Sequence, residues 1–255
     1  MAFEVEIPFN KKKVQLNVFK FKHINQLHWF KNSLSGRVKF LESFILTKGL
    51  NAIEKFAALL LLRGECIDSS VSVQRGKRLV NVDLEYMLKP FTRITNIRST
   101  VKHESFEFIF DYPSRLCIDS DTMLSVVRQI KIDDQIINLD NLPDNEYKDV
   151  ISNLPPSCLS VITSFIDNNS EHFVCTPLPE NDSIDFTDYN SSVFISNLFD
   201  CVDEANYREY LFLLSKRFSD INFLLNSTFY EIEDYLNLYR KESQEQNAEL
   251  QKTIG

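Results

Sequence analysis

The beginning of the chain alternates between apolar and polar side chains with the period of two that is typical of β-strands. Two such arms are joined by a polar stretch at residues 10–13, so the pattern predicts a β-hairpin over residues 3–21. The tip of this hairpin carries three consecutive basic residues, which we expect to be solvated. The apolar positions are Phe3, Val5 and Ile7 on one arm and Val14, Leu16 and Val18 on the other, and the basic residues are Lys11, Lys12 and Lys13.

From His23 onwards the apolar positions follow the period of a helix. The clearest helix is predicted to begin at Asn51, whose side chain can cap it, while Glu54 stands at the position that completes a capping box. Its apolar stripe consists of Ile53, Phe56, Leu59 and Leu60. The pair Arg63-Gly64 predicts its end.

The middle of the chain favours strands. A short helix is predicted over residues 82–89, where Pro90 would stop it. Strands are predicted next at residues 94–101, 106–110 and 115–118, and a second hairpin is predicted to pair residues 126–132 with 135–139. We therefore expect a β-rich part between residues 91 and 142.

The last quarter of the chain, after about residue 190, is predicted to be helical, and two short helices and a polar segment precede it. Two short helices surround Pro155, and residues 167–190 are rich in Asn, Asp, Ser and Pro, which indicates a linker or a long loop. Asp203 can cap one later helix, and the capping box from Thr228 to Glu231 begins the final one. This final helix has an apolar stripe of Phe229, Ile232, Tyr235, Leu236 and Tyr239. Beyond Arg240 it becomes polar on every face, so we expect the tail to project into solvent or onto a partner.

Together these patterns predict an α+β protein. The expected divisions are a hairpin with helices at 1–90, a β-rich part at 91–142, short helices with a polar linker at 143–190, and a helical domain at 191–255.

Composition adds two features to this picture. The chain has 21 Phe and only 5 Gly among its 255 residues, which gives large apolar faces and few tight phosphate-binding loops. Residues 1–128 hold 20 basic and 13 acidic side chains, a net charge of +7, whereas residues 129–255 hold 8 and 23, a net charge of −15. This asymmetry is consistent with an acidic partner, with head-to-tail contact between copies, or with two differently charged solvated surfaces.

The five cysteines are widely spaced and odd in number, which favours reduced thiols in a cytosolic setting. The N-terminal sequence lacks the order of segments found in a signal peptide. The longest apolar run, at residues 56–62, is far shorter than the roughly 20 residues that span a bilayer, so we expect a core helix there.

Motifs for chemistry are not recognisable in the sequence. There is no phosphate-binding or dinucleotide-binding glycine motif and no nucleophile elbow, and His23 and His28 are five residues apart, which does not place them on one helical face. The carboxylates of Asp182, Asp185 and Asp188 lack the glycine and closing glutamate of a calcium loop. We therefore predict that the protein is not an enzyme and has no catalytic, cofactor-binding or metal-binding residues.

Two alternatives remain open. The protein is a nucleic-acid-associated adaptor if its central basic stretch binds phosphates, although a pI near 5.1 is unusual for that class. A hydrolase or transferase with an active site scattered along the sequence is the second alternative, and it requires a deep pocket with perturbed ionisable groups. The basic stretch consists of Arg75, Lys77, Arg78, Arg93, Arg98 and Lys102.

The order of three segments resembles the baseplate hub and hub-assembly proteins of contractile-tailed bacteriophages (myoviruses). The segments are VEIPFNKKKVQLNVFKFKHINQL at residues 5–27, VDLEYMLKPFTRITNIRSTV at residues 82–101, and the helical segment at residues 207–247 that begins YREYLFLLSKRF. The resemblance implies a hub component or a hub-assembly chaperone that works in the host cytoplasm, with a place in the virion if it stays in the tail.

That resemblance implies no catalytic residues. It implies partners among other phage tail and baseplate proteins, and self-association is left open. Neither nucleic acid nor a membrane is expected as a partner. Many aromatic residues and a divided charge suit protein interfaces in the same way. We expect the contacts to involve the hairpin tip and the final helix. The candidate residues are Lys11, Lys12, Lys13, Tyr235, Tyr239, Arg240 and Lys241.

Overall fold

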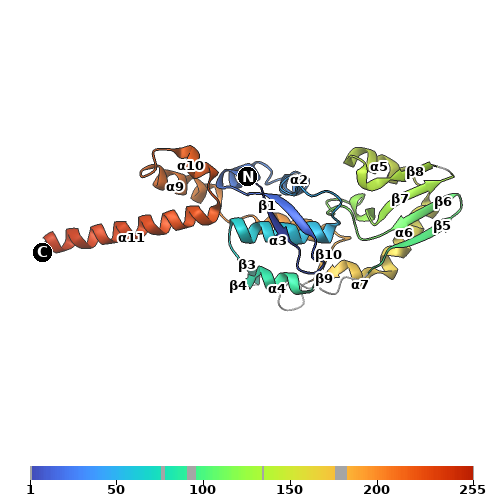
Figure 1. Cartoon of the computed structure of the whole chain (residues 1–255), viewed down its shortest axis with the longest axis horizontal. Helices are drawn as coiled ribbons and strands as arrows, with labels where there is room; N and C mark the ends of the chain where they lie inside the picture. Colours follow the sequence, from blue (N-terminus) through green and yellow to red (C-terminus); the bar gives the residue numbers. More distant parts are fainter. Residues whose placement is uncertain (1, 76–77, 91–95, 134, 176–182, 255) are drawn as a thin grey trace.

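The structure is a computed structural model that describes residues 2–75, 78–90, 96–133, 135–175 and 183–254. Helices and strands are mixed along the chain, with a hairpin at the N-terminus and helices at the C-terminus, so the predicted α+β class is confirmed. Figure 1 shows an elongated molecule with a sheet at one end, a helical centre, and a long C-terminal helix standing away from the other end.

The predicted N-terminal hairpin forms, but its second strand ends at Asn17, and the predicted bound at residue 21 is wrong because Phe21 begins a helix. Strands β1 (Ala2–Glu6) and β2 (Lys13–Asn17) pair antiparallel, with Val5 opposite Val14. Val14 and Leu16 are completely buried because this face of the hairpin lies on the core.

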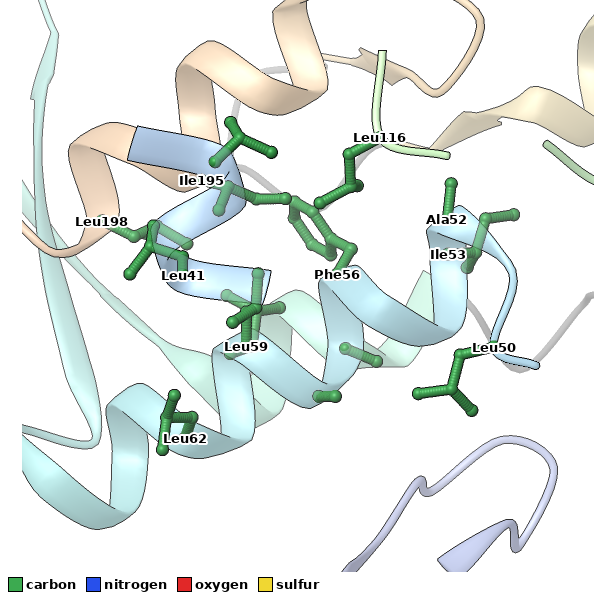
Figure 2. Packing of buried hydrophobic residues seen from close by; sticks show 14 of the residues in the cluster. Leu41, Leu50, Ala52, Ile53, Phe56, Leu59, Leu62, Leu116, Ile195 and Leu198 are labelled. Atoms are coloured by element: carbon green, nitrogen blue, oxygen red, sulfur yellow. The ribbon is translucent and has the colours of Figure 1, made fainter. Parts of the chain in front are cut away.

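Three helices follow the hairpin, and the third is the centre of the core. Figure 2 shows Phe56 facing Ile195 and Leu116, which come from distant parts of the sequence. The predicted capping box is confirmed, because Glu54 N–H donates to Asn51 Oδ1 at 2.8 Å and Asn51 N–H donates to Glu54 Oε2 at 2.9 Å. The helices are α1 (Phe21–Trp29), α2 (Leu34–Glu42) and α3 (Ala52–Cys66).

The predicted end of α3 at Arg63-Gly64 is wrong, because the helix continues to Cys66. The Arg63 side chain is buried and donates hydrogen bonds to the carbonyls of Leu198, Asp68 and Ser70, which holds the last turn in place. Gly64 serves close packing instead, since a Cβ there would lie 3.3 Å from Leu84 Cδ1.

The predicted helix over residues 82–89 is partly wrong. Residues 82 and 83 end a second hairpin, made of β3 (Ser70–Arg75) and β4 (Arg78–Asp83), and the helix α4 (Leu84–Leu88) begins only after it. Asp83 explains the boundary, because its carboxylate accepts a hydrogen bond from Glu85 N–H and caps the helix.

A four-stranded antiparallel sheet forms the β-rich middle, in the order β5-β6-β7-β8. The predicted strand at 106–110 is confirmed, and so is the predicted hairpin of residues 126–132 and 135–139, which forms β7 and β8. Of the strand predicted at 94–101, residues 94 and 95 lie outside the described residues, and pairing begins at Ser99. The strands are β5 (Ser99–His103), β6 (Phe106–Phe110), β7 (Val127–Ile132) and β8 (Gln135–Asn138).

The strand predicted at residues 115–118 does not form. There the backbone bonds to side chains, since Ile118 N–H donates to Thr122 Oγ1 at 2.9 Å. Thr122 begins the short 3₁₀ helix η2 (Thr122–Leu124), which leads into β7, and a second one, η3 (Leu139–Asn141), follows β8.

Helices α5 (Asp144–Ser152) and α6 (Pro156–Asn168) follow the sheet, and Phe165 of α6 stacks on Phe110 of β6 with ring centroids 4.4 Å apart. The segment predicted as a polar linker continues with α7 (Ser170–Phe173) and the paired short strands β9 (Val174–Cys175) and β10 (Ile184–Asp185). Phe173 and Phe186 are buried, so both described ends of this segment are anchored in the core.

The chain ends in four helices: α8 (Asn190–Leu198), α9 (Glu204–Ser215), α10 (Ile221–Asn226) and α11 (Phe229–Ile254). The predicted caps are confirmed, because Asn206 N–H donates to Asp203 and Thr228 N–H donates to Glu231 Oε2. A continuous set of buried apolar residues connects these helices with the hairpin and the sheet. The domain boundaries stay predictions.

Candidate protein-binding surface

Helix α11 extends well beyond the core. Its first turns are fixed by the buried side chains of Phe229, Ile232 and Leu236. After Glu242 the helix continues for another 12 residues to Ile254, or about 18 Å at 1.5 Å per residue. We call this part, residues 243–254, the α11 extension, and Figure 1 shows it standing clear of the other elements. Exposed residues on it include Gln244, Glu245, Gln246, Ala248, Glu249 and Gln251.

An aromatic cluster packs at the root of α11. The ring of Tyr235 lies 5.1 Å from that of Phe218 and 5.9 Å from that of Phe223, and the two phenylalanine rings are 5.8 Å apart. The cluster joins α11 to α10 and to the turn after α9. Tyr235, a predicted contact residue, therefore also fixes the direction in which α11 leaves the core.

Arg217 supports the next turn of α11. Its guanidinium lies 5.7 Å from the ring centre of Tyr239, and it forms an ion pair with Glu242. The other predicted residues of this helix, Arg240 and Lys241, are exposed. The ion pair of Arg217 with Glu242 thus lies at the point where the α11 extension begins.

Several large apolar side chains around this root are open to solvent. Phe212 is 61% exposed, Phe223 is 48% exposed and Leu238 is 58% exposed. Lys216 covers part of Phe212, with Nζ 4.3 Å from the ring centre. Together with Tyr235 and Tyr239 these residues form what we call the root surface, and aromatic anchors beside charged groups are typical of protein interfaces.

The predicted hairpin residues lie elsewhere and are paired with carboxylates. Lys11 Nζ is 3.3 Å from Glu6 and Lys13 Nζ is 2.9 Å from Glu4, both on the hairpin itself. The Glu4 carboxylate raises the pKa of Lys13.

Lys12 instead reaches the core, where its Nζ lies 3.1 Å from Glu54 at the start of α3. The opposite end of α3 is nearer to α11. Cys66 Sγ at that end accepts a hydrogen bond from Phe19 N–H, and the ring of Phe21 stacks on Phe229 at the start of α11. The structure therefore separates the two predicted contact regions by the length of α3.

Burial shifts the pKa of three thiols and of one imidazole. Burial raises the pKa of the Cys66 and Cys117 thiols to about 11 and that of Cys201 to about 12, so all three are protonated at neutral pH. Burial, assisted by Lys22 and Lys20, lowers the pKa of His23 to about 4.

Metal ligands do not converge in the described part of the chain, where no group of three or more His, Cys, Asp or Glu side chains could hold an ion. Asp182 lies outside the described residues. The neighbouring carboxylates bond locally, since Asp185 accepts hydrogen bonds from Thr187, and Asp188 accepts one from Asn190 N–H.

The structure describes only some of the side chains of the central basic stretch. Lys77 and Arg93 lie outside the described residues, as do the side chains of Arg75 and Arg78. Arg98 is exposed, and Lys102 lies 3.6 Å from the carboxylate of Glu107.

Among the helices that the structure describes, none is both long enough and apolar enough to cross a membrane. Comparison of the chain with protein-family models, with curated proteins and with solved structures gave no match. The α11 extension and the root surface are therefore interpreted from their own geometry.

Proposed function

We propose that the protein works by binding other proteins, as a hub component of a phage tail baseplate or as a chaperone that helps the hub to assemble. The observation that carries the proposal is the α11 extension, a helical segment of 12 residues that leaves the core and on which six of the seven described side chains are exposed. Helices in proteins gain most of their stability from tertiary packing, so contact with a partner would stabilise this exposed part of α11.

The root surface would supply most of the apolar contact. Full burial of a large apolar side chain contributes about 1.5–3 kcal/mol, so covering the half-exposed Phe212, Phe223 and Leu238 would contribute on the order of 2–4 kcal/mol. Charges would set the orientation of the partner, because Arg240 and Lys241 precede Glu245 and Glu249 along the helix.

The choice of a baseplate hub rests on the resemblance of three segments and on their order along the chain. Those segments correspond to the N-terminal hairpin with α1, to the stretch from β4 to β5, and to α9 through α11. The protein would then act in the host cytoplasm, and it would be found in the virion only if it is a hub component.

The test uses tagged full-length protein and a truncated form that ends at Ser243, each produced in infected cells and purified under native conditions. Mass spectrometry of the purified material should find tail or hub proteins with the full-length chain and at least tenfold less with the truncated form. Detection of the chain in purified virions would identify a hub component, and its absence there would identify a chaperone.

A matched control is the full-length chain carrying Asp149→Lys, an exposed change on α5 that should leave recovery unchanged. Circular dichroism should show that the truncated form retains its folded core, since Arg217 and Glu242 remain. Recovery of nucleic acid without any tail protein, or equal recovery by the truncated form, would contradict the proposal.

A further inference from the structure

A groove runs beside the sheet at a place unconnected with α11. It has a volume of about 510 Å³ and lies between strand β5 and helix α6. β5 stands at one edge of the four-stranded sheet and pairs only with β6 among the described strands. Edge strands present backbone N–H and C=O groups that are able to pair with another chain.

The sides of the groove combine a short apolar surface with small polar side chains. Val101 from β5 and Val161 and Phe165 from α6 supply the apolar surface. On α6 the groove is lined by Ser160 and Ser164, whose hydroxyls donate to helix carbonyls at 3.2 and 2.8 Å and so need no further partner as donors. Small residues at this spacing leave room for side chains that enter from outside.

His103 gives an independent indication that the groove lacks a binding partner. It lines the groove, and its Nε2 atom is buried without a hydrogen-bond partner, because the Glu104 carboxylate is 3.6 Å away. A buried polar atom without a partner destabilises the folded state. A bound chain that supplies a backbone group at this position would remove that destabilisation.

The lining also limits the charge of the occupant. Apart from His103, every described residue that lines the groove is uncharged, including Ser157, Asn168 and Asn169. A charged side chain placed against the serine and apolar residues of α6 would lose hydration without gaining a countercharge from them. Uncharged side chains of small or β-branched type fit both the serine side and the apolar side.

We propose that this groove binds an extended, uncharged segment of a partner protein, which adds to β5 as a fifth strand of the sheet. The backbone of the segment would pair with β5, and alternate side chains would lie against Ser160 and Ser164 of α6. This site is separate from the root surface, so it stands or falls independently of the function proposed for α11.

The test probe is a display library of random twelve-residue peptides, presented to the full-length protein and to two variants. Ser160→Trp places an indole in the groove, whereas Thr163→Trp places one on an exposed part of α6 that does not line it. Peptides selected on the natural protein should be uncharged and rich in alternating β-branched residues. They should bind the Thr163→Trp variant equally well and the Ser160→Trp variant at least tenfold more weakly.

Amide hydrogen exchange provides the second measurement, and binding of a selected peptide should slow exchange within residues 99–103. If Ser160→Trp does not fold, Ser164→Met gives a smaller obstruction with the same expected direction. Equal binding to all forms, no enrichment on the natural protein, or unchanged exchange in β5 would overturn the proposal. A dimer of the natural protein that Ser160→Trp dissociates would also overturn it, because the occupant would then be a second copy.

Discussion

Replacing Arg63 with methionine would test how far one buried guanidinium connects α3 with the segments around it. Arg63 Nε donates to the Leu198 carbonyl at 2.7 Å, and Nη1 donates to the carbonyls of Asp68 and Ser70 at 2.6 and 2.5 Å. These acceptors belong to the end of α8, to the turn that leads into β3 and to the first residue of β3. The substitution would leave them without this donor.

The expected loss of stability follows from these three bonds. A hydrogen bond from a charged donor contributes about 1.5–3 kcal/mol, so three would contribute roughly 4–9 kcal/mol if they were additive. Part of this is offset by the cost of burying the charge, which also lowers the pKa of Arg63, and by the packing of the methionine side chain. We expect the free energy of unfolding to fall by about 3–5 kcal/mol, a large part of the roughly 5–15 kcal/mol typical of folded proteins.

The assay is urea unfolding followed by far-UV circular dichroism at pH 7. Arg63→Lys should lose most of the same stability, because a single ammonium group cannot reproduce the forked guanidinium geometry. Arg98→Met is the matched control at an exposed arginine, and it should change stability by no more than about 0.5 kcal/mol. A loss below about 1 kcal/mol for Arg63→Met would refute the reasoning.

Three further predictions concern a cap, a titration and the thiols. Thr228→Ala should lower the free energy of unfolding by about 1 kcal/mol in the same urea assay, because it removes the hydroxyl that accepts a hydrogen bond from Glu231 N–H at 3.3 Å. An unchanged urea midpoint of unfolding would contradict this. His23 has a pKa of about 4 when folded against 6.5 when unfolded, so the unfolded chain binds the proton first and stability should fall as pH drops from about 6.5 to 4. His23→Asn should reduce this pH dependence, and an identical profile would exclude His23 as its source. At pH 8 a thiol reagent should react much more slowly with the folded protein than with the urea-unfolded protein. Rapid native labelling would contradict the buried state of Cys66 and Cys117 and the protonated state of these two thiols and of Cys201.

The elements that could be predicted from the sequence are those fixed by residues a few positions apart. The capping boxes at Asn51 and Thr228 place their donors and acceptors within three residues of each other, so their local sequence determines where the helices begin. The alternation of the N-terminal hairpin is similarly local, and it reappears in the structure with Val5 opposite Val14.

The errors arise where distant residues decide the local structure. Arg63-Gly64 has the composition of a helix end, but Arg63 binds Leu198, 135 positions away, and Gly64 is packed against Leu84. Residues 115–118 have the side chains of a strand, yet their backbone bonds to Thr122 instead of to a neighbouring strand.

The candidate surface was only partly predictable for the same reason. Tyr235 and Tyr239 stand out on the stripe of the final helix, but only the packing of Phe218 and Arg217 shows how they orient it. Phe212 and Phe223 could not be distinguished from core residues by sequence, because their exposure depends on how α9 and α10 lie on α11.

Photo-crosslinking from the α11 extension is the most direct test of the proposed function. A benzophenone side chain would replace Glu245 on the α11 extension or, as a control, Asp149 on α5, in full-length protein made in infected cells. Irradiation should yield adducts with tail or hub proteins from position 245 and none of these from position 149. If position 245 gave no such adduct, or if both positions gave the same ones, α11 would not be the contact through which this protein works.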